Sequence, residues 1–163
     1  MTFIYNWKNK EANFGKPLEK QVKGGTHITC EIILKHQGKY IALRRASIPG
    51  HEAPSRKKIL YFCHNLIRYG ESIDQCVKRI VKSQTGVSIK SCKVVYIDSN
   101  IQKKDKQWAI TPHIIAELNK KPKTGYFGNQ ITEVVKFTKN KIPKDFAFWP
   151  VSELKNFLQE FDS

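Results

Sequence analysis

The hydrophobic and polar positions of this chain fall into alternating runs that favour β-strands. Residues 27–46 predict a β-hairpin, because two runs of this kind flank a tight turn at 37–39. Pro112 predicts a bulge or an edge position in one of the later strands. Those later strand-like runs occupy 58–67, 90–98, 108–119 and 131–140.

Two segments have helical periodicity. In residues 72–85, Ser72 is a suitable N-cap and Gly86 a suitable stop. The apolar positions of this segment recur at helical spacing and are Ile73, Cys76, Val77, Ile80 and Val81. A closing helix is expected after Ser152, also as N-cap. The order hairpin, strand, helix, several strands and helix predicts a mixed α/β (α+β) domain with a sheet between two helices.

Length and composition predict one domain. The chain has 163 residues, of which 40% are hydrophobic, enough for a core. Residues 1–25 are polar and are interpreted as an N-terminal extension that packs on a domain of residues 26–163. We see no apolar run of membrane-spanning length and no signal-like start, so we expect a cytoplasmic protein.

The four cysteines are scattered and form no C-x-x-C pair. Zinc and redox motifs are therefore not indicated, and the cysteines are interpreted as small core residues of a reduced protein.

The charge is strongly basic. Twenty-nine lysines and arginines stand against fourteen acidic residues, a net charge of +15. Such a field attracts polyanions, so RNA or DNA is a possible partner through basic loops. These loops are Arg56–Lys58, Lys103–Lys106 and Lys120–Lys123. The alternative is a solvated lysine-rich surface, because most of the basic residues are lysines and nucleic-acid readers use more arginine.

Residues 70–87 contain a distinctive frame. A Gly-Glu-Ser start at Gly70 is followed by Arg79, eight residues after Glu71, and by a Thr-Gly end at Gly86. This frame and the order of elements resemble the Nudix superfamily, whose signature is GX5EX7REUXEEXGU. The resemblance covers roughly residues 26–163, including FWPVSELKNF near the end.

Anchored on Glu71, the signature matches at five positions and fails at four. The matches are Glu71, Arg79, Val81, Gly86 and Val87, and the mismatches are Asn65, Ile80, Ser83 and Gln84. In the family, the positions of Glu71 and Arg79 help to hold the loop and helix together. The positions of Ile80, Ser83 and Gln84 are those where the family keeps metal-binding glutamates.

The mismatches have a direct chemical consequence. Mg²⁺ and Mn²⁺ prefer carboxylate oxygens, and positions 80, 83 and 84 lie on neighbouring turns of a helix. An isoleucine, a hydroxyl and an amide at these positions predict that no metal is held there. The chain has other carboxylates outside this signature, at Asp98, Asp105, Glu117 and Glu133. By its order in the chain Glu117 is the best placed of them, and family members often add such a ligand.

Five residues are candidates for contacts with a phosphorylated ligand. Arg44 and Arg45 are adjacent on a strand and point to opposite faces, so one of them can meet a phosphate, or both are solvated. His64 is a conceivable general base, although a hydrogen-bonded surface histidine is commoner. Arg68, before the helix, and Lys82, on it, complete this set.

The sequence favours a Nudix-like domain that binds a nucleotide or nucleic acid without hydrolysing it and without a cofactor. The alternative is an atypical hydrolase, which would cleave a nucleoside diphosphate linked to another group with Mg²⁺ or Mn²⁺ held by other carboxylates. A structural subunit of a larger complex is a third possibility. Metal binding at the helix distinguishes the hydrolase from the binder.

Overall fold

The structure is a computed structural model that describes residues 26–46, 59–101, 103 and 106–162. The expected N-terminal extension, the basic loop at 56–58 and Asp105 lie outside these ranges. The described strands form a seven-stranded mixed sheet. They are β1 (Thr26–His36), β2 (Lys39–Arg45), β3 (Ile59–Tyr61), β4 (Cys63–Leu66), β5 (Ile89–Ile101), β6 (Trp108–Leu118) and β7 (Ile131–Phe137).

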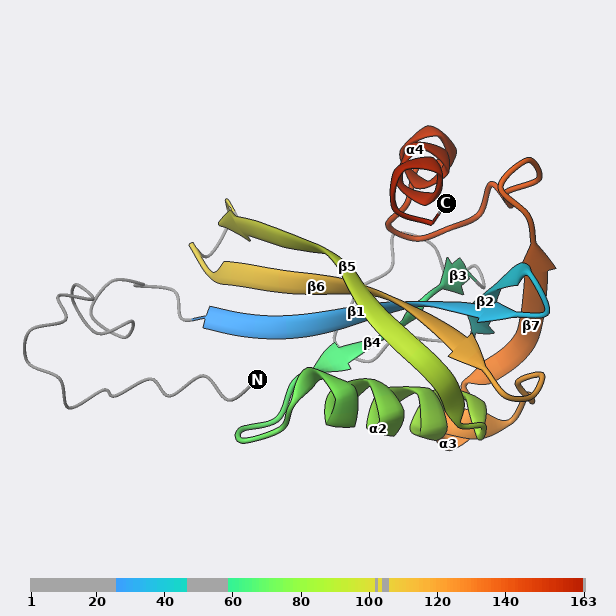
Figure 1. The fold of residues 1–163 in the computed structure, drawn as a ribbon, viewed down its shortest axis with the longest axis horizontal. Coiled ribbons are helices and arrows are strands. Elements are labelled where there is room, and N and C mark those ends of the chain that lie inside the picture. Colours follow the sequence, from blue (N-terminus) through green and yellow to red (C-terminus); the bar gives the residue numbers. More distant parts are fainter. Residues whose placement is uncertain (1–25, 47–58, 102, 104–105, 163) are drawn as a thin grey trace, which may run out of the picture.

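Helices lie on both sides of this sheet. Figure 1 shows α2 (Ile73–Thr85) below it and α4 (Val151–Phe161) above it, with the short α3 (Tyr126–Asn129) near the end of α2. The α+β fold with a sheet between two helices is therefore confirmed. None of the helices in the described part of the chain is long and apolar enough to cross a membrane.

The sheet runs in the order β3-β2-β1-β6-β5, with β1 and β6 parallel. The hairpin partners β1 and β2 pair only near their turn, at Leu34–His36. Farther from the turn, β2 pairs with β3 and β1 pairs with β4. The single strand expected at 58–67 is therefore two strands separated at Phe62, because its halves join different neighbours.

Two apolar cores form on the two faces of the sheet. Along β1, Ile32 and Leu34 pack on the α2 side, whereas Ile33 packs on the α4 side. This alternation follows from the two-residue period of a strand. It also decides which polar side chains of β1 and β6 lie on the side of α4. Of the four free cysteines, all but Cys92 are buried, as expected for core residues.

Three sequence expectations need correction. The edge position offered for Pro112 is wrong, because β6 lies between β1 and β5, whereas the pairing beside it is irregular, as its bulge alternative expected: the β1–β6 pairing has a gap after Ile110, and the β5–β6 register shifts between Val94 and Tyr96. The missing N–H of proline accounts for such a gap. The closing helix begins at Val151, with Pro150 as its N-cap, so Ser152 lies inside it. The last strand ends at Phe137.

Candidate functional site

The α2 helix is capped at both ends by residues next to it in the chain. Ser72 accepts a hydrogen bond from the backbone N–H of Gln75, and the Gln75 side chain accepts one from the backbone N–H of Ser72. This reciprocal capping box satisfies two N–H groups that a helix start leaves unpaired. Gly86 closes the other end with φ of 71°, a conformation that favours glycine.

An ion pair ties the preceding loop to the helix. Arg79 donates from Nε and Nη2 to the two carboxylate oxygens of Glu71, both at 2.7 Å. Arg79 Nη2 also donates to the carbonyl of Leu66, and Glu71 Oε2 accepts from the backbone N–H of Arg68. The Arg79 guanidinium lowers the pKa of Glu71 to about 2. This carboxylate therefore holds the loop in place and is already bound by three N–H donors.

The three helix positions with unusual residues are each engaged within the protein. Ile80 is 1% exposed and belongs to the core on the α2 side. Ser83 donates its hydroxyl to the carbonyl of Ile80 at 2.9 Å. Gln84 is also 1% exposed, and its amide nitrogen donates to the carbonyl of His64 on β4 at 2.9 Å.

This donor set does not fit the divalent cation that the fold family uses. Such a cation needs several oxygen ligands, preferably carboxylates. The face of α2 offers an alkyl group, a hydroxyl and an amide whose nitrogen is a donor. Within the described residues, no group of three or more histidine, cysteine, aspartate or glutamate side chains is arranged to hold a metal ion.

The described carboxylates outside the signature, Asp98, Glu117 and Glu133, lie away from α2. Glu117 pairs in register with Lys35, which binds Asp162 just after α4, so strand alternation places Glu117 on the α4 side of the sheet. The structure therefore does not bring Glu117 to the helix. Glu133 is paired with Arg44, and Asp98 lines a cavity beside α4.

Two of the five candidate phosphate contacts, Arg45 and His64, lie near the ring of Tyr61. The Arg45 guanidinium lies 6.0 Å from the centre of the Tyr61 ring, and the His64 ring centre lies 6.2 Å from it. Arg45 is buried and donates to Gln130.

The other three candidates lie elsewhere in the chain or contact other groups. Arg44 forms ion pairs with Glu133 and Asp145. Arg68 precedes the start of α2, whereas Lys82 lies in its last turn and donates to the carbonyl of Gly86.

A pocket does form on the α4 side of the sheet, which we call the Tyr61 pocket. It has a volume of about 380 Å³. Its walls come from β1, from the β3–β4 segment, from the facing ends of β5 and β6 and from the segment before α4. The residues that line it include His27, Thr29, Glu31, Tyr61, His64, Asn100, Thr111, Phe148 and Trp149.

The floor of the Tyr61 pocket carries a positioned carboxylate. Trp149 donates from its indole nitrogen to Glu31 Oε1 at 2.8 Å, and His113 Nδ1 lies 3.5 Å from Glu31 Oε2. Burial raises the pKa of Glu31 and lowers that of His113.

Sequence reasoning did not identify Glu31, Asn100 or Trp149 as site residues. A signal for the first was present, because His27, Thr29 and Glu31 alternate with Ile28 and Cys30 along the strand. No local signal pointed to Asn100, since only the pairing of β5 with β6 carries it to this pocket.

The two lysine clusters in the described ranges do not converge. Lys103 and Lys106 precede β6, whereas Lys120, Lys121 and Lys123 follow it. At about 3.3 Å per residue, the two clusters are roughly 35 Å apart along the strand. The structure therefore does not assemble these two loops into one basic surface.

Known structures resemble this chain in fold. A MutT Nudix hydrolase from Burkholderia pseudomallei matches with a TM-score of 0.62 and 12% identity, over 85% of this chain and 98% of that chain. A Nudix hydrolase from Nitrosomonas europaea matches with a TM-score of 0.63 and 15% identity, over 83% and 90% of the two chains. A MutT protein from Bacillus halodurans matches with a TM-score of 0.60 and 15% identity, over 84% and 83%.

No family model and no curated protein matches the sequence. At identities of 12% to 15% the structural matches show the fold alone. The chain has a Nudix fold, which confirms the resemblance inferred from residues 70–87.

Proposed function

We propose that this Nudix-fold domain binds a nucleotide, or another phosphorylated ligand with a planar ring, without hydrolysing it. The observation that carries the proposal is the state of the α2 face. Ile80 is packed in the core, and Ser83 and Gln84 donate to backbone carbonyls. Hydrolysis of a phosphoanhydride in this fold needs a cation at that face, and these groups do not supply its ligands.

The Tyr61 pocket supports binding of a nucleotide-sized ligand. Aromatic side chains stack on any base, and Phe148 stands edge-on to Tyr61 with ring centres 5.7 Å apart. Glu31 can accept hydrogen bonds from the edge of a base, and Asn100 can donate or accept. Of the candidate phosphate contacts, His64 lines this pocket, whereas Arg45 is buried and does not line it.

The same observations favour a small ligand over a long nucleic acid. The pocket volume suits one nucleotide, and the lysine loops at the two ends of β6 do not form one track for a polyanion. The proposal therefore rests on the pocket and not on the net charge.

Calorimetric titration with nucleoside mono- and diphosphates in the presence of EDTA tests this proposal. We expect saturable binding without metal. Phe148→Ala removes a stacking surface and should weaken binding about 5- to 150-fold, from ~1–3 kcal/mol per stacked base. Tyr69→Ala is the matched control, because Tyr69 is an exposed aromatic residue in the loop before α2 and does not line the pocket.

A phosphate-release assay with Mg²⁺ or Mn²⁺ distinguishes binding without hydrolysis from hydrolysis. We expect no turnover of nucleoside diphosphate derivatives. Turnover by the natural chain that Glu71→Gln abolishes would contradict the proposal and support an atypical hydrolase. Equal nucleotide affinities of Phe148→Ala and Tyr69→Ala would show that the Tyr61 pocket is not the binding site.

A further inference from the structure

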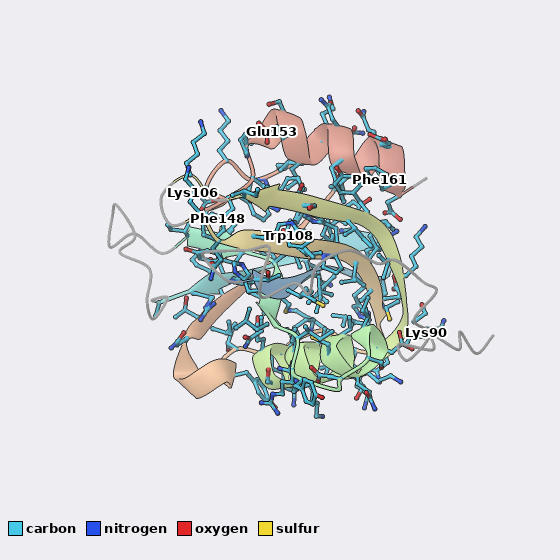
Figure 2. All side chains as sticks on the ribbon, turned by 90° about the vertical axis from the view of Figure 1, so that its left-hand side faces the viewer. Lys90, Lys106, Trp108, Phe148, Glu153 and Phe161 are labelled. Carbon is cyan, nitrogen blue, oxygen red and sulfur yellow. The ribbon has the colours of Figure 1, made fainter. Side chains whose placement is uncertain are left out.

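A second cavity lies between α4 and the strands β5 and β6, and we call it the α4 cavity. It has a volume of about 600 Å³ and shares Glu31, Phe148 and Trp149 with the Tyr61 pocket. In Figure 2, Glu153 and Phe161 mark the two ends of α4, which lies across β5. Among the described residues, neither the α2 helix nor the lysine clusters line this cavity.

The α4 cavity is acidic although the protein is strongly basic. Four of the fourteen acidic residues of the chain line it, namely Glu31, Asp98, Glu153 and Glu160. Within the described ranges, no lysine or arginine lies within ion-pair distance of any of these four carboxylates. A concave wall that concentrates one sign of charge attracts ligands of the opposite sign.

Aromatic rings form the rest of the wall. Phe157 lies next to Trp149 and Phe161, with ring centres 5.2 and 4.8 Å apart, and Tyr96 lies 5.5 Å from Phe161. The faces of such rings attract cations, most strongly where carboxylates are nearby and water is excluded. Tyr96 lines the cavity and is 46% exposed.

A buried polar atom at this wall lacks a partner. His113 is 7% exposed, and its Nδ1 atom has no hydrogen bond within the described part of the chain. The carboxylate of Glu31 approaches it only to 3.5 Å. Buried polar groups are almost always hydrogen-bonded, so an unsatisfied one that lines a cavity indicates a missing ligand group or water.

The spacing of the carboxylates in the α4 cavity suits an organic cation better than a metal ion. A Ca²⁺ or Mg²⁺ site requires several oxygens to converge at about 2.0–2.6 Å from one point. The four carboxylates, with His113, do not converge in this way, since the described residues contain no metal-binding group of three or more such side chains. A cation of several atoms can contact carboxylates that are spread around a cavity.

We propose that the α4 cavity binds an organic ammonium ion, held between the aromatic wall and the carboxylates of Asp98, Glu153 and Glu160. The ammonium group is recognised by its positive charge over the rings of Tyr96 and Trp149. This inference does not depend on the ligand of the Tyr61 pocket, because the recognised group carries neither a base nor a phosphate.

Titration of the full chain, followed by backbone amide NMR shifts at constant ionic strength, tests the inference. The probes are choline and putrescine. The neutral alcohol 3,3-dimethylbutan-1-ol, which has the shape of choline without its charge, is the reference ligand. We expect saturable shifts in β5 and α4 with the cations, and affinity for the neutral alcohol lower by about tenfold, as a cation–π contribution near 1.4 kcal/mol gives.

Two variants locate the site. Tyr96→Leu should weaken choline binding about 2- to 30-fold, and Glu160→Gln should weaken it as well. Their matched controls are Tyr69→Leu and Asp74→Asn, an exposed aromatic residue before α2 and an acidic residue in its first turn. The controls should leave the affinity unchanged.

Three results would overturn the inference. The first is the absence of saturable shifts with choline and putrescine. The second is equal affinity for choline and the neutral alcohol, which would mean a purely apolar pocket. The third is equal weakening by Glu160→Gln and Asp74→Asn, which would mean diffuse attraction to any carboxylate on the surface.

Discussion

Gln84 occupies a position where the Nudix signature has a glutamate, and its amide makes a structural hydrogen bond there. Its amide nitrogen donates to the carbonyl of His64 while the side chain is almost fully buried. A glutamate at this position has the same length but no N–H, so its oxygens would face the carbonyl oxygen of His64. The amide therefore joins α2 to β4 where a metal-binding carboxylate would need a cation beside it.

The Gln84→Glu variant should be destabilised by about 3 kcal/mol or more at neutral pH, because it buries an uncompensated charge and leaves a carbonyl without its donor. Urea unfolding measures the difference. Ser83→Glu is the matched control, since position 83 is exposed, and it should change stability by only about 0.5 kcal/mol. Equal costs at the two positions would contradict the role given to Gln84.

Glu71 should make the stability of the domain depend on pH. Arg79 lowers the pKa of Glu71 from its ordinary value of 4.5 to about 2. A lowered pKa in the folded state means that the stabilisation is present above pH 4.5 and is lost as the pH falls towards 2. Glu71→Gln should therefore be less stable than the natural chain at pH 7, and the difference should shrink between pH 4.5 and 2.

Urea unfolding across this pH range measures the effect. Arg79→Gln should show the same pH dependence, and the double variant should lose less than the sum of the two single losses, because both changes remove one ion pair. A difference that stays constant from pH 7 to pH 2 would show that the pair does not stabilise the fold.

At the scale of elements, the end of α2 is held by its neighbour α3. Gly86 has a positive φ of 71°, and a Cβ built on it would lie 2.0 Å from the ring of Tyr126, the first residue of α3. Glycine is therefore required twice, for its backbone conformation and for the close approach of an aromatic ring.

Gly86→Ala should cost more than Gly70→Ala in thermal unfolding. Both glycines have a positive φ, but a Cβ at Gly70 meets nothing within 4 Å. Gly70→Ala should therefore show only the backbone cost, about 1–2 kcal/mol, and Gly86→Ala this cost plus a clash. Adding Tyr126→Ala should recover part of the loss at Gly86, and no recovery would show that the ring does not limit this position.

At the scale of the whole molecule, two helices stabilise two separate cores on one sheet. The α4 core contains Leu154 and Leu158, and Lys35 on β1 binds Asp162 at the end of the helix. The two candidate pockets lie on this side, and a third pocket, of about 460 Å³, lies beside the start of α2, where Arg68, Tyr69 and Glu71 are among its lining residues. Docking of α4 is therefore a condition for the α4 cavity, whose wall it forms, whereas no α4 residue lines the Tyr61 pocket.

Leu154→Ala should lower the free energy of unfolding by about 2–5 kcal/mol, because it leaves a cavity under α4. Thermal or urea unfolding measures it, with Leu66→Ala as the control, since Leu66 is 51% exposed. A small change at Leu154 would show that α4 contributes little to the stability of the sheet.

Much of the fold was predictable from the sequence because it depends on neighbours in the chain. The periodicity of residues 73–85, the cap at Ser72 and the stop at Gly86 are local features, and the structure confirms them. The absence of carboxylates at positions 80, 83 and 84 is also a property of the sequence alone. The break at Phe62 was not predictable, because it depends on which strands its two sides join.

The two candidate pockets were decided by the tertiary structure. Trp149 and Glu31 form a hydrogen bond across 118 positions of the chain, and the parallel pairing of β1 with β6 sets which side chains of β6 share their face. The same pairing places Glu117 on the α4 side, away from the helix that sequence order assigned to it. Local patterns specify helices, strands and caps through interactions within a few residues, whereas a pocket is the product of contacts between distant segments, and only the folded chain brings those together.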